Sequence, residues 1–222
     1  MQMSNVHIGL PLPDSCSECY LVKGMYQYYH YCCDGQNDTG WGCGYRTLQT
    51  MCSWINNNCH IDKKPPDFPT LWKIQETLVN IGDKPLSFLK SREWIGSFEI
   101  CLFLDHYYNI PSKIIHVRSG RDVGSKFDDL MTHFQKFGSP VMIGGDSDAA
   151  SKALLGVAVD GRKKHFLILD PHFSGNPNID YLQDNGWVTW KDEELFLNES
   201  FYNFCLPQCG QSDSRSDHSH TQ

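Results

Sequence analysis

The chain has 222 residues, of which 40% are hydrophobic and 13% aromatic, and its formal net charge is −7. This composition is typical of a globular protein with one sizeable core, and it excludes a largely disordered chain. The acidic balance argues against a nucleic-acid partner or an anionic membrane surface, both of which are recognised by basic stripes. No apolar run approaches ~20 residues, so the sequence predicts no membrane-spanning helix.

The first residues and the cysteines indicate where the protein resides. Residues 1–10 carry neither the basic nor the apolar segment of a secretory signal. Ten cysteines in a chain of this size, without such a signal, predict reduced thiols and a cytoplasmic protein. Several lie inside apolar runs, where a cysteine acts as a small hydrophobe: Cys52, Cys101 and Cys205.

The predicted elements begin with a flexible amino terminus at 1–13 and short strands at 20–22 and 25–31, which are rich in aromatic residues. Residues 34–42 hold three glycines together with Asp, Asn and Thr, a composition that predicts a loop.

A helical pattern begins at Cys43. Apolar residues at steps of three, four and three define one face of a helix: Tyr45, Leu48, Cys52 and Ile55. This helix should end in the asparagines at 56–58, because Pro65 and Pro66 prevent its continuation. Further helices are predicted at 70–81, 94–108 and 127–137, with a strand at 113–117.

The second half of the chain has mostly strand character. Strands are predicted at 140–143, 155–159, 165–170, 187–190 and 201–206. The polar link at 160–164 suits an antiparallel hairpin. Residues 207–222 contain almost nothing apolar and are expected to form a disordered tail. Helices followed by clustered antiparallel strands predict one α+β domain over residues 14–206.

Cys43 is the first candidate for chemistry. A cysteine attacks as a thiolate, and the free N–H groups and dipole of a first helical turn favour that negative charge. Gly42 and Gly44 flank it and would let a substrate carbonyl approach the sulfur, with Trp41 as a wall of that approach. The alternative for a lone cysteine here is a buried structural residue beside a tight turn.

An acid and a histidine follow the apolar run at 167–169, in the order Asp170-Pro171-His172. On an extended segment these two side chains point to the same face, with Cα atoms roughly 6.5–7 Å apart. An aspartate bonded to one imidazole nitrogen leaves the other free to accept a thiol proton. Alone, the pair could simply end a strand; with Cys43, it predicts a hydrolase with a cysteine nucleophile.

The Gly-Trp-Gly-Cys box at 40–43, followed by Tyr-Arg-Thr-Leu-Gln-Thr at 45–50, resembles the ubiquitin-fold-modifier-specific cysteine proteases. Similar stretches lie at 83–85, 91–96, 140–146, 151–157, 169–172 and 201–203, so the resemblance covers about 20–206 and is closest to the short, single-domain form of the family. It implies a papain-like fold and cleavage after the C-terminal glycine of the modifier. That reaction would mature the modifier precursor and release the modifier from lysines. The implied partner is the modifier, bound by a monomer that needs no cofactor.

By position, the resemblance implies four catalytic residues: the nucleophile Cys43, the base His172, the orienting acid Asp170 and the oxyanion donor Tyr31. Asn37 stays open as another donor, because it lies six residues before the cysteine, where papain has a glutamine. The resemblance also suggests that Trp94 anchors the folded body of the modifier. The alternative is that Trp94 is the first core residue of its helix.

Two other functions are considered. Autophagin-type proteases share the Gly-Trp-Gly-Cys box and the Asp-Pro-His order, but they are usually longer and the stretches at 94–96 and 201–203 fit them poorly. A catalytically silent modifier-binding module would lack a catalytic residue, and none is missing here. No metal is predicted, because the spacing of four cysteines matches Cys-x2-Cys pairs poorly: Cys16, Cys19, Cys32 and Cys33.

Overall fold

The protein is described by a computed structural model that covers residues 2–60, 67–146, 151–176 and 178–209. Its helices are α1 (Cys43–Asn58), α2 (Leu71–Asn80), α3 (Ser97–Tyr108), α4 (Phe127–Lys136) and the short α5 (Ile179–Asp184). The first four agree with the predicted helices, although α3 begins three residues later than expected. The reason is local, because the Glu99 carboxylate accepts the Gly96 N–H at 2.9 Å and so caps the helix there.

The strands form a seven-stranded sheet in the order β2-β7-β3-β4-β5-β6, with β1 paired to β4. Their bounds are β1 (Glu18–Leu21), β2 (Ser112–Val117), β3 (Val141–Gly145), β4 (Lys152–Asp160), β5 (Lys163–Leu169), β6 (Val188–Asp192) and β7 (Tyr202–Pro207). All these pairs are antiparallel, and β4 and β5 form the predicted hairpin. The α+β prediction is therefore confirmed.

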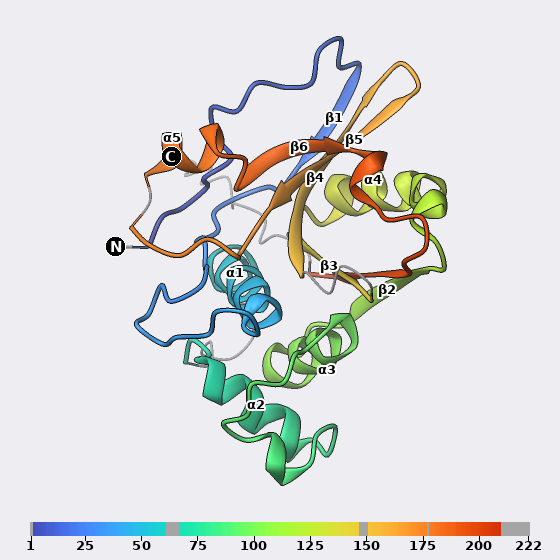
Figure 1. The fold of residues 1–222 in the computed structure, drawn as a ribbon. Helices are drawn as coiled ribbons and strands as arrows, with labels where there is room; N and C mark the ends of the chain where they lie inside the picture. Colours follow the sequence, from blue (N-terminus) through green and yellow to red (C-terminus); the bar gives the residue numbers. More distant parts are fainter. Residues whose placement is uncertain (1, 61–66, 147–150, 177, 210–222) are drawn as a thin grey trace, which may run out of the picture.

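Helices cover both faces of the sheet (Figure 1). Neighbouring residues of one strand point to opposite faces, so Leu167 faces the core beneath α1 and α3, whereas Phe166 and Ile168 face the core beneath α4. This double burial explains why β4 and β5 each contain an uninterrupted apolar run, at 153–159 and 166–169. It also fixes the first turn of α1 against the sheet, where β3 and β5 end.

The segment 25–31 does not form the predicted strand. It runs along α1, and side chains of that helix accept its backbone N–H groups: Gln27 N–H bonds Ser53 Oγ at 2.8 Å, and Tyr29 N–H bonds Thr50 Oγ1 at 3.1 Å. The aromatic side chains of the segment contribute to the core, and Tyr26 is 0% exposed. Hydrogen bonds to a helix thus replace the ladder that strand propensity predicted.

The prediction of a flexible amino terminus at 1–13 is wrong for the part that packs on this segment. Val6 is 0% exposed within the core, and Asn5 N–H donates to Tyr26 O at 3.0 Å. Apolar contact and backbone pairing therefore order a stretch whose sequence carries no periodic pattern.

The expectation that every thiol is reduced is also corrected. Cys59, after α1, forms a disulfide with Cys209, which lies 150 residues further along the chain. The tail predicted at 207–222 is therefore ordered at its start, because Pro207 ends β7 and Cys209 is bonded. Residues 210–222 lie outside the described part of the chain.

Candidate active site

Cys43 is the first residue of α1, and its side chain is almost buried at 5% exposed. Its backbone N–H has no acceptor within the helix, as for every first-turn residue. The next residue must be small, because a Cβ added to Gly44 would lie 2.4 Å from the carbonyl oxygen of Ile95. The close approach of the 95–96 segment therefore brings a second chain segment to the sulfur.

The histidine and its acid come from the turn after β5. Asp170 Oδ1 accepts two hydrogen bonds from His172, one from the backbone N–H at 2.9 Å and one from the imidazole Nδ1–H at 2.5 Å. Asp170 is itself held by its backbone, since its N–H donates to Trp187 O and its carbonyl accepts the Tyr28 hydroxyl. The turn thereby presents the other imidazole nitrogen to Cys43, whose sulfur is hydrogen-bonded to the His172 side chain.

The electrostatics favour a thiolate–imidazolium pair. Burial alone would raise the pKa of Cys43, but hydrogen bonds from His172 and the Ser151 N–H, with the charge of His172, bring that pKa below its ordinary value. Burial would lower the pKa of His172, but the bonds to Asp170 and Cys43 and their charges raise it to about 9. The two shifts act in the same sense, toward a thiolate beside an imidazolium, with the sulfur as the nucleophile.

Tyr31 lies against this pair. Its hydroxyl is hydrogen-bonded to the Cys43 side chain and to the backbone of Gly40, and its ring stands edge-on to His172 with centroids 5.2 Å apart. Burial and the neighbouring Cys43 charge raise the pKa of Tyr31, so the hydroxyl keeps its proton and stays a donor. Asn37 is exposed, and its Oδ1 accepts the Thr39 N–H within its own loop.

A groove of about 250 Å³ opens at the sulfur. The residues lining it are Cys43, Trp94, Ile95, Gly96, Gly144, Gly145, Asp146 and Ser151. Trp94 is 57% exposed and its indole N–H donates to Gly40 O at 3.1 Å, so the alternative that it is a core residue is wrong. Trp41, in contrast, is 5% exposed and packs on Tyr45 and Trp72 rather than lining the groove.

Sequence reasoning missed two contributors to this site. The Ser151 N–H reaches the sulfur of Cys43, but a backbone donor has no residue-type signal. The glycines at 144 and 145 belong to a stretch that supported the resemblance, yet only the fold brings them into one groove with Cys43 and Trp94.

The described residues do not bring three His, Cys, Asp or Glu side chains together as a metal site would. Cys16 and Cys19 interact with each other, whereas Cys33 Sγ lies 3.5 Å from Arg46 Nη1. Within the same part of the chain, no helix combines the length and apolar character needed to cross a membrane.

Replacing Tyr31 with phenylalanine should lower kcat on the order of 10²-fold with little change in KM, because one donor to a developing oxyanion is removed. Steady-state cleavage rates would measure this. An unchanged kcat would instead assign the role to Asn37 or to backbone N–H groups alone, and Asn37→Ala is the matched comparison.

The pH dependence of Cys43 alkylation should reveal its charged partner. Iodoacetamide reacts with the thiolate, so the rate in the wild type should reach half its maximum below the pH typical of a free thiol. In His172→Ala the cationic neighbour is lost while burial remains, and the midpoint should move to higher pH. Mass spectrometry of the Cys43 peptide gives these rates, and equal midpoints would contradict the ion pair.

A thiol at a helix start, an imidazole and a carboxylate, held on an antiparallel sheet, define a cysteine peptidase of papain-like fold. Residues 17–205 match the sequence model of Peptidase family C78, and the chain belongs to this family. The predicted resemblance and fold are thus confirmed.

Its relatives differ in length. The chain is 44% identical over 208 residues to Ufm1-specific protease 1 of Mus musculus, covering 92% of this chain and 93% of the relative. It is 42% identical over 207 residues to Ufm1-specific protease 2 of Gallus gallus, covering 92% of this chain but only 44% of the relative. The crystal structure of UfSP from C. elegans superposes with a TM-score of 0.82 at 33% identity, covering 95% of this chain and 38% of that one.

Proposed function

We propose that this chain is a thiol protease that cleaves after the C-terminal glycine of the ubiquitin-fold modifier Ufm1. The observation that carries the proposal is the groove beside Cys43, whose lining includes three glycines: Gly96, Gly144 and Gly145. Glycines carry no side chain, so this lining lets an extended peptide backbone approach the sulfur closely. The names of the relatives, Ufm1-specific proteases, supply the modifier.

Each side chain has a step in this proposed reaction. The Cys43 thiolate attacks the glycine carbonyl carbon, and the oxyanion is stabilised by the Tyr31 hydroxyl and the Cys43 N–H. As the C–N bond breaks, His172 gives its proton to the departing amine and a thioester remains. Water then attacks the thioester, His172 accepts its proton, and Cys43 is released; Asp170 keeps the imidazole oriented throughout.

The leaving amine decides which products form. An α-amine belongs to the residue after the glycine in a precursor, and an ε-amine belongs to a conjugated lysine. We assign the groove to the acyl side of the bond, so that the same site matures the precursor and releases conjugates. We place this activity in the cytoplasm, in a monomer, which is consistent with eight of the ten cysteines being free thiols.

Cleavage of purified precursors tests the proposal. The wild type should convert the Ufm1 precursor to the form ending in glycine and leave precursors of the lipid-conjugated autophagy modifiers intact, as read by intact mass. The opposite preference would assign it to the autophagin type. An electrophilic Ufm1 probe should add to Cys43; binding of Ufm1 without adduct or cleavage would indicate the silent binding module.

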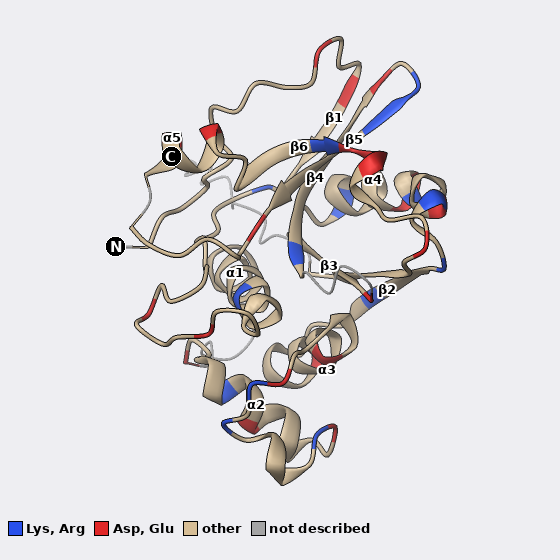
Figure 2. Cartoon of the chain, in the orientation of Figure 1, with Lys and Arg blue, Asp and Glu red and all other residues tan. Residues whose placement is uncertain are grey.

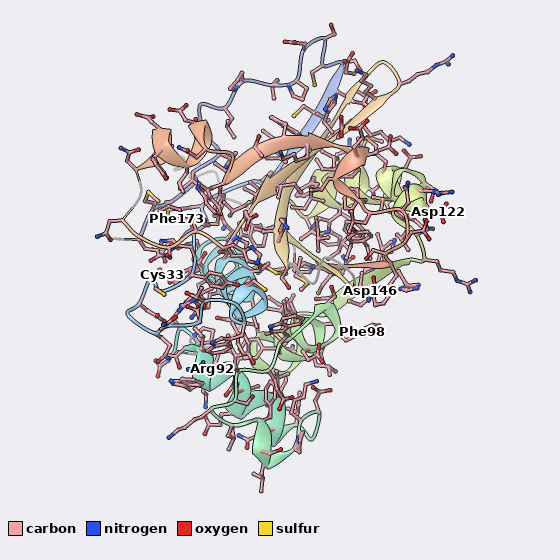
Figure 3. The ribbon with its side chains drawn as sticks, in the orientation of Figure 1. Cys33, Arg92, Phe98, Asp122, Asp146 and Phe173 are labelled. Carbon is pink, nitrogen blue, oxygen red and sulfur yellow. A yellow bond between two sulfur atoms is a disulfide. The ribbon has the colours of Figure 1, made fainter. Side chains whose placement is uncertain are left out.

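Trp94 is proposed to contact the body of the modifier. It stands at the groove with more than half of its surface free, and Phe98, 59% exposed, follows at the start of α3. Figure 3 labels Phe98 just below Asp146, which lines the groove together with Trp94. Apolar side chains at the mouth of a groove are typical anchors for a protein substrate.

Trp94→Ala should raise KM for the Ufm1 precursor, while a short peptide ending in glycine is cleaved as before and the melting temperature is unchanged. Met25→Ala is the matched control, because Met25 is 46% exposed but bonds Asn58 at the far end of α1. A lower melting temperature with unchanged KM would place the docking surface elsewhere.

A further inference from the structure

A buried ion pair lies one turn beyond Cys43. Arg46 on α1 and Asp38 in the preceding loop are both 0% exposed. Arg46 Nε donates to Asp38 Oδ2 at 2.8 Å, and Arg46 Nη2 donates to Asp38 Oδ1 at 3.0 Å. The guanidinium therefore binds the carboxylate in a bidentate manner. Figure 2 shows this arrangement as a basic position on α1 facing acidic positions of the loop before it.

Asp38 connects the two chain segments that carry the reacting groups, through its carboxylate on one side and its backbone carbonyl on the other. Asp38 Oδ1 also accepts the backbone N–H of Cys32 at 2.8 Å, the residue directly after Tyr31. The backbone carbonyl of Asp38 accepts the N–H of Gly42 at 2.8 Å, the residue directly before Cys43. Asp38 therefore touches the immediate neighbour of both the nucleophile and the proposed oxyanion donor.

The packing around Asp38 leaves it no freedom. A Cβ added to Gly42 would lie 1.9 Å from Asp38 Oδ2, so the carboxylate fills the space that this glycine leaves. The loop also carries Gly40, whose backbone is hydrogen-bonded to the Tyr31 hydroxyl. A shift of Asp38 would therefore move Tyr31 in two ways. It would move the Tyr31 backbone through the neighbouring Cys32, and it would move the Tyr31 hydroxyl through Gly40.

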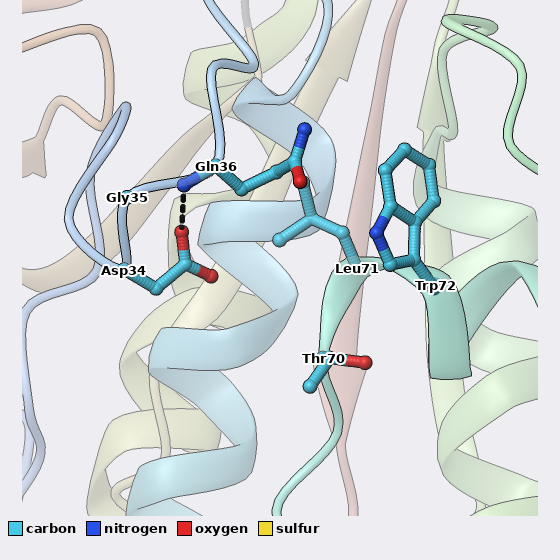
Figure 4. A pocket seen from close by; sticks show the side chains of 6 residues that line it. All are labelled: Asp34, Gly35, Gln36, Thr70, Leu71 and Trp72. Carbon is cyan, nitrogen blue, oxygen red and sulfur yellow. Dashed lines mark hydrogen bonds between the residues drawn. The ribbon is translucent and has the colours of Figure 1, made fainter.

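A second carboxylate, that of Asp34, also binds the Arg46 guanidinium. Arg46 Nη1 and Nη2 donate to the two carboxylate oxygens of Asp34 at 2.9 and 2.8 Å. The Asp34 side chain is 39% exposed and also accepts the Gln36 N–H, at the edge of a surface pocket that Trp72 borders (Figure 4). Asp34 makes none of the contacts to Cys32 or Gly42 that Asp38 makes, and so provides a matched comparison.

We propose that Asp38, locked by Arg46, is a positioning residue that holds the Tyr31 hydroxyl at the oxyanion site beside Cys43. A buried ion pair is by itself weak evidence for a role in stability, because desolvation offsets much of the attraction. Asp38 nevertheless has a geometric role, since its carboxylate bonds the Cys32 N–H and its backbone carbonyl bonds the Gly42 N–H, which sets the separation between the segments of Tyr31 and Cys43. This inference rests on the proposed function, in which Tyr31 stabilises an oxyanion.

Asp38→Asn and Asp34→Asn test the inference, because each removes one carboxylate charge from the same guanidinium. Asp38→Asn should lower kcat for the Ufm1 precursor on the order of tenfold with KM within about twofold, whereas Asp34→Asn should keep kcat. Alkylation of Cys43 by iodoacetamide forms a C–S bond, expels iodide and passes through no oxyanion. At a pH high enough to ionise Cys43 in every variant, where the contact with Tyr31 no longer changes the thiolate fraction, its rate should therefore stay unchanged in both variants.

A double-mutant cycle with Tyr31→Phe separates positioning from general damage. If Asp38 acts through the Tyr31 hydroxyl, Asp38→Asn should lower kcat in the wild type but hardly at all in Tyr31→Phe. Equal losses in the two backgrounds would overturn the proposal, as would a kcat loss in Asp34→Asn that matches that of Asp38→Asn. A parallel loss of alkylation at the pH where Cys43 is fully ionised would also overturn it, because the pair would then act on the sulfur itself and not on the oxyanion site.

Two further measurements keep the outcome clear. If Asp38→Asn does not fold, Arg46→Lys keeps the charge but loses the bidentate hold on the same carboxylate, and it should give the same kcat loss, the same alkylation and the same dependence on Tyr31. All rates are also measured on N-acetylglycine p-nitrophenyl ester. A wild type that hydrolyses the ester but not the Ufm1 precursor would refute the proposed substrate, while the ester cycle still tests Asp38.

Discussion

Replacing Cys43 with serine is expected to abolish cleavage of the modifier precursor, with kcat reduced by at least about 10⁴-fold. The site lowers the pKa of a thiol through His172, the Ser151 N–H and Tyr31, and it thereby supplies a thiolate. A serine hydroxyl in the same place stays protonated, because its intrinsic acidity is far lower than that of a thiol. Fold and substrate binding should persist, since oxygen and sulfur side chains have similar shapes.

Time courses of precursor cleavage followed by intact mass would measure this effect, and binding of the mature modifier would show that the site remains formed. Cys19→Ser is the matched control, because Cys19 lies on β1, away from the groove. Residual cleavage by Cys43→Ser would refute the assignment. Labelling of the fully buried Cys52 by an electrophilic probe would do the same.

The second large effect separates His172 from Asp170. His172→Ala should lower kcat nearly as far as Cys43→Ser, because the side chain that holds the thiolate and protonates the amine is gone. Asp170→Asn should lower kcat less, because an orienting group contributes less than the reacting ones. An asparagine oxygen can still accept the His172 N–H that Asp170 Oδ1 accepts at 2.9 Å.

Asp170→Asn should also change the pH profile, which distinguishes an electrostatic role from a structural one. Hydrogen bonding to Asp170 and its charge help raise the pKa of His172 to about 9, so the imidazolium of the wild type is lost only as pH rises through that value. Without the carboxylate charge this pKa falls, and the alkaline limb of kcat/KM should move to lower pH. His106→Ala, an exposed histidine on α3, is the control. If Asp170→Asn and the wild type have the same kcat and the same alkaline limb of kcat/KM, the aspartate has no role in the mechanism.

Local sequence patterns were sufficient for most of the secondary structure. The apolar period that begins at Cys43 predicted α1 because a buried helix repeats every 3.6 residues. The polar link at 160–164 predicted the hairpin between β4 and β5, because antiparallel strands joined by a short turn are neighbours in sequence. These signals are contained within a few residues, so no tertiary contact was needed to read them.

Tertiary contacts decided the elements for which local signals misled. The aromatic segment 25–31 has strand propensity, yet its N–H groups bond side chains of α1. The amino terminus has no periodicity, yet Val6 is buried by contacts with residues far along the chain. Propensity describes only which backbone a residue favours, whereas the partner that satisfies each N–H depends on the packed fold.

The sequence by itself determined which residues could react: a cysteine at a helix start, and an acid and a histidine two residues apart after a strand. Only the tertiary structure decided their surroundings. It turned Tyr31 rather than Asn37 toward the sulfur, placed Trp94 rather than Trp41 on the groove, and joined Asp38 to Arg46 behind them. The physical reason is that each of these choices depends on which side of a loop is buried, and burial is decided by distant segments that pack against it.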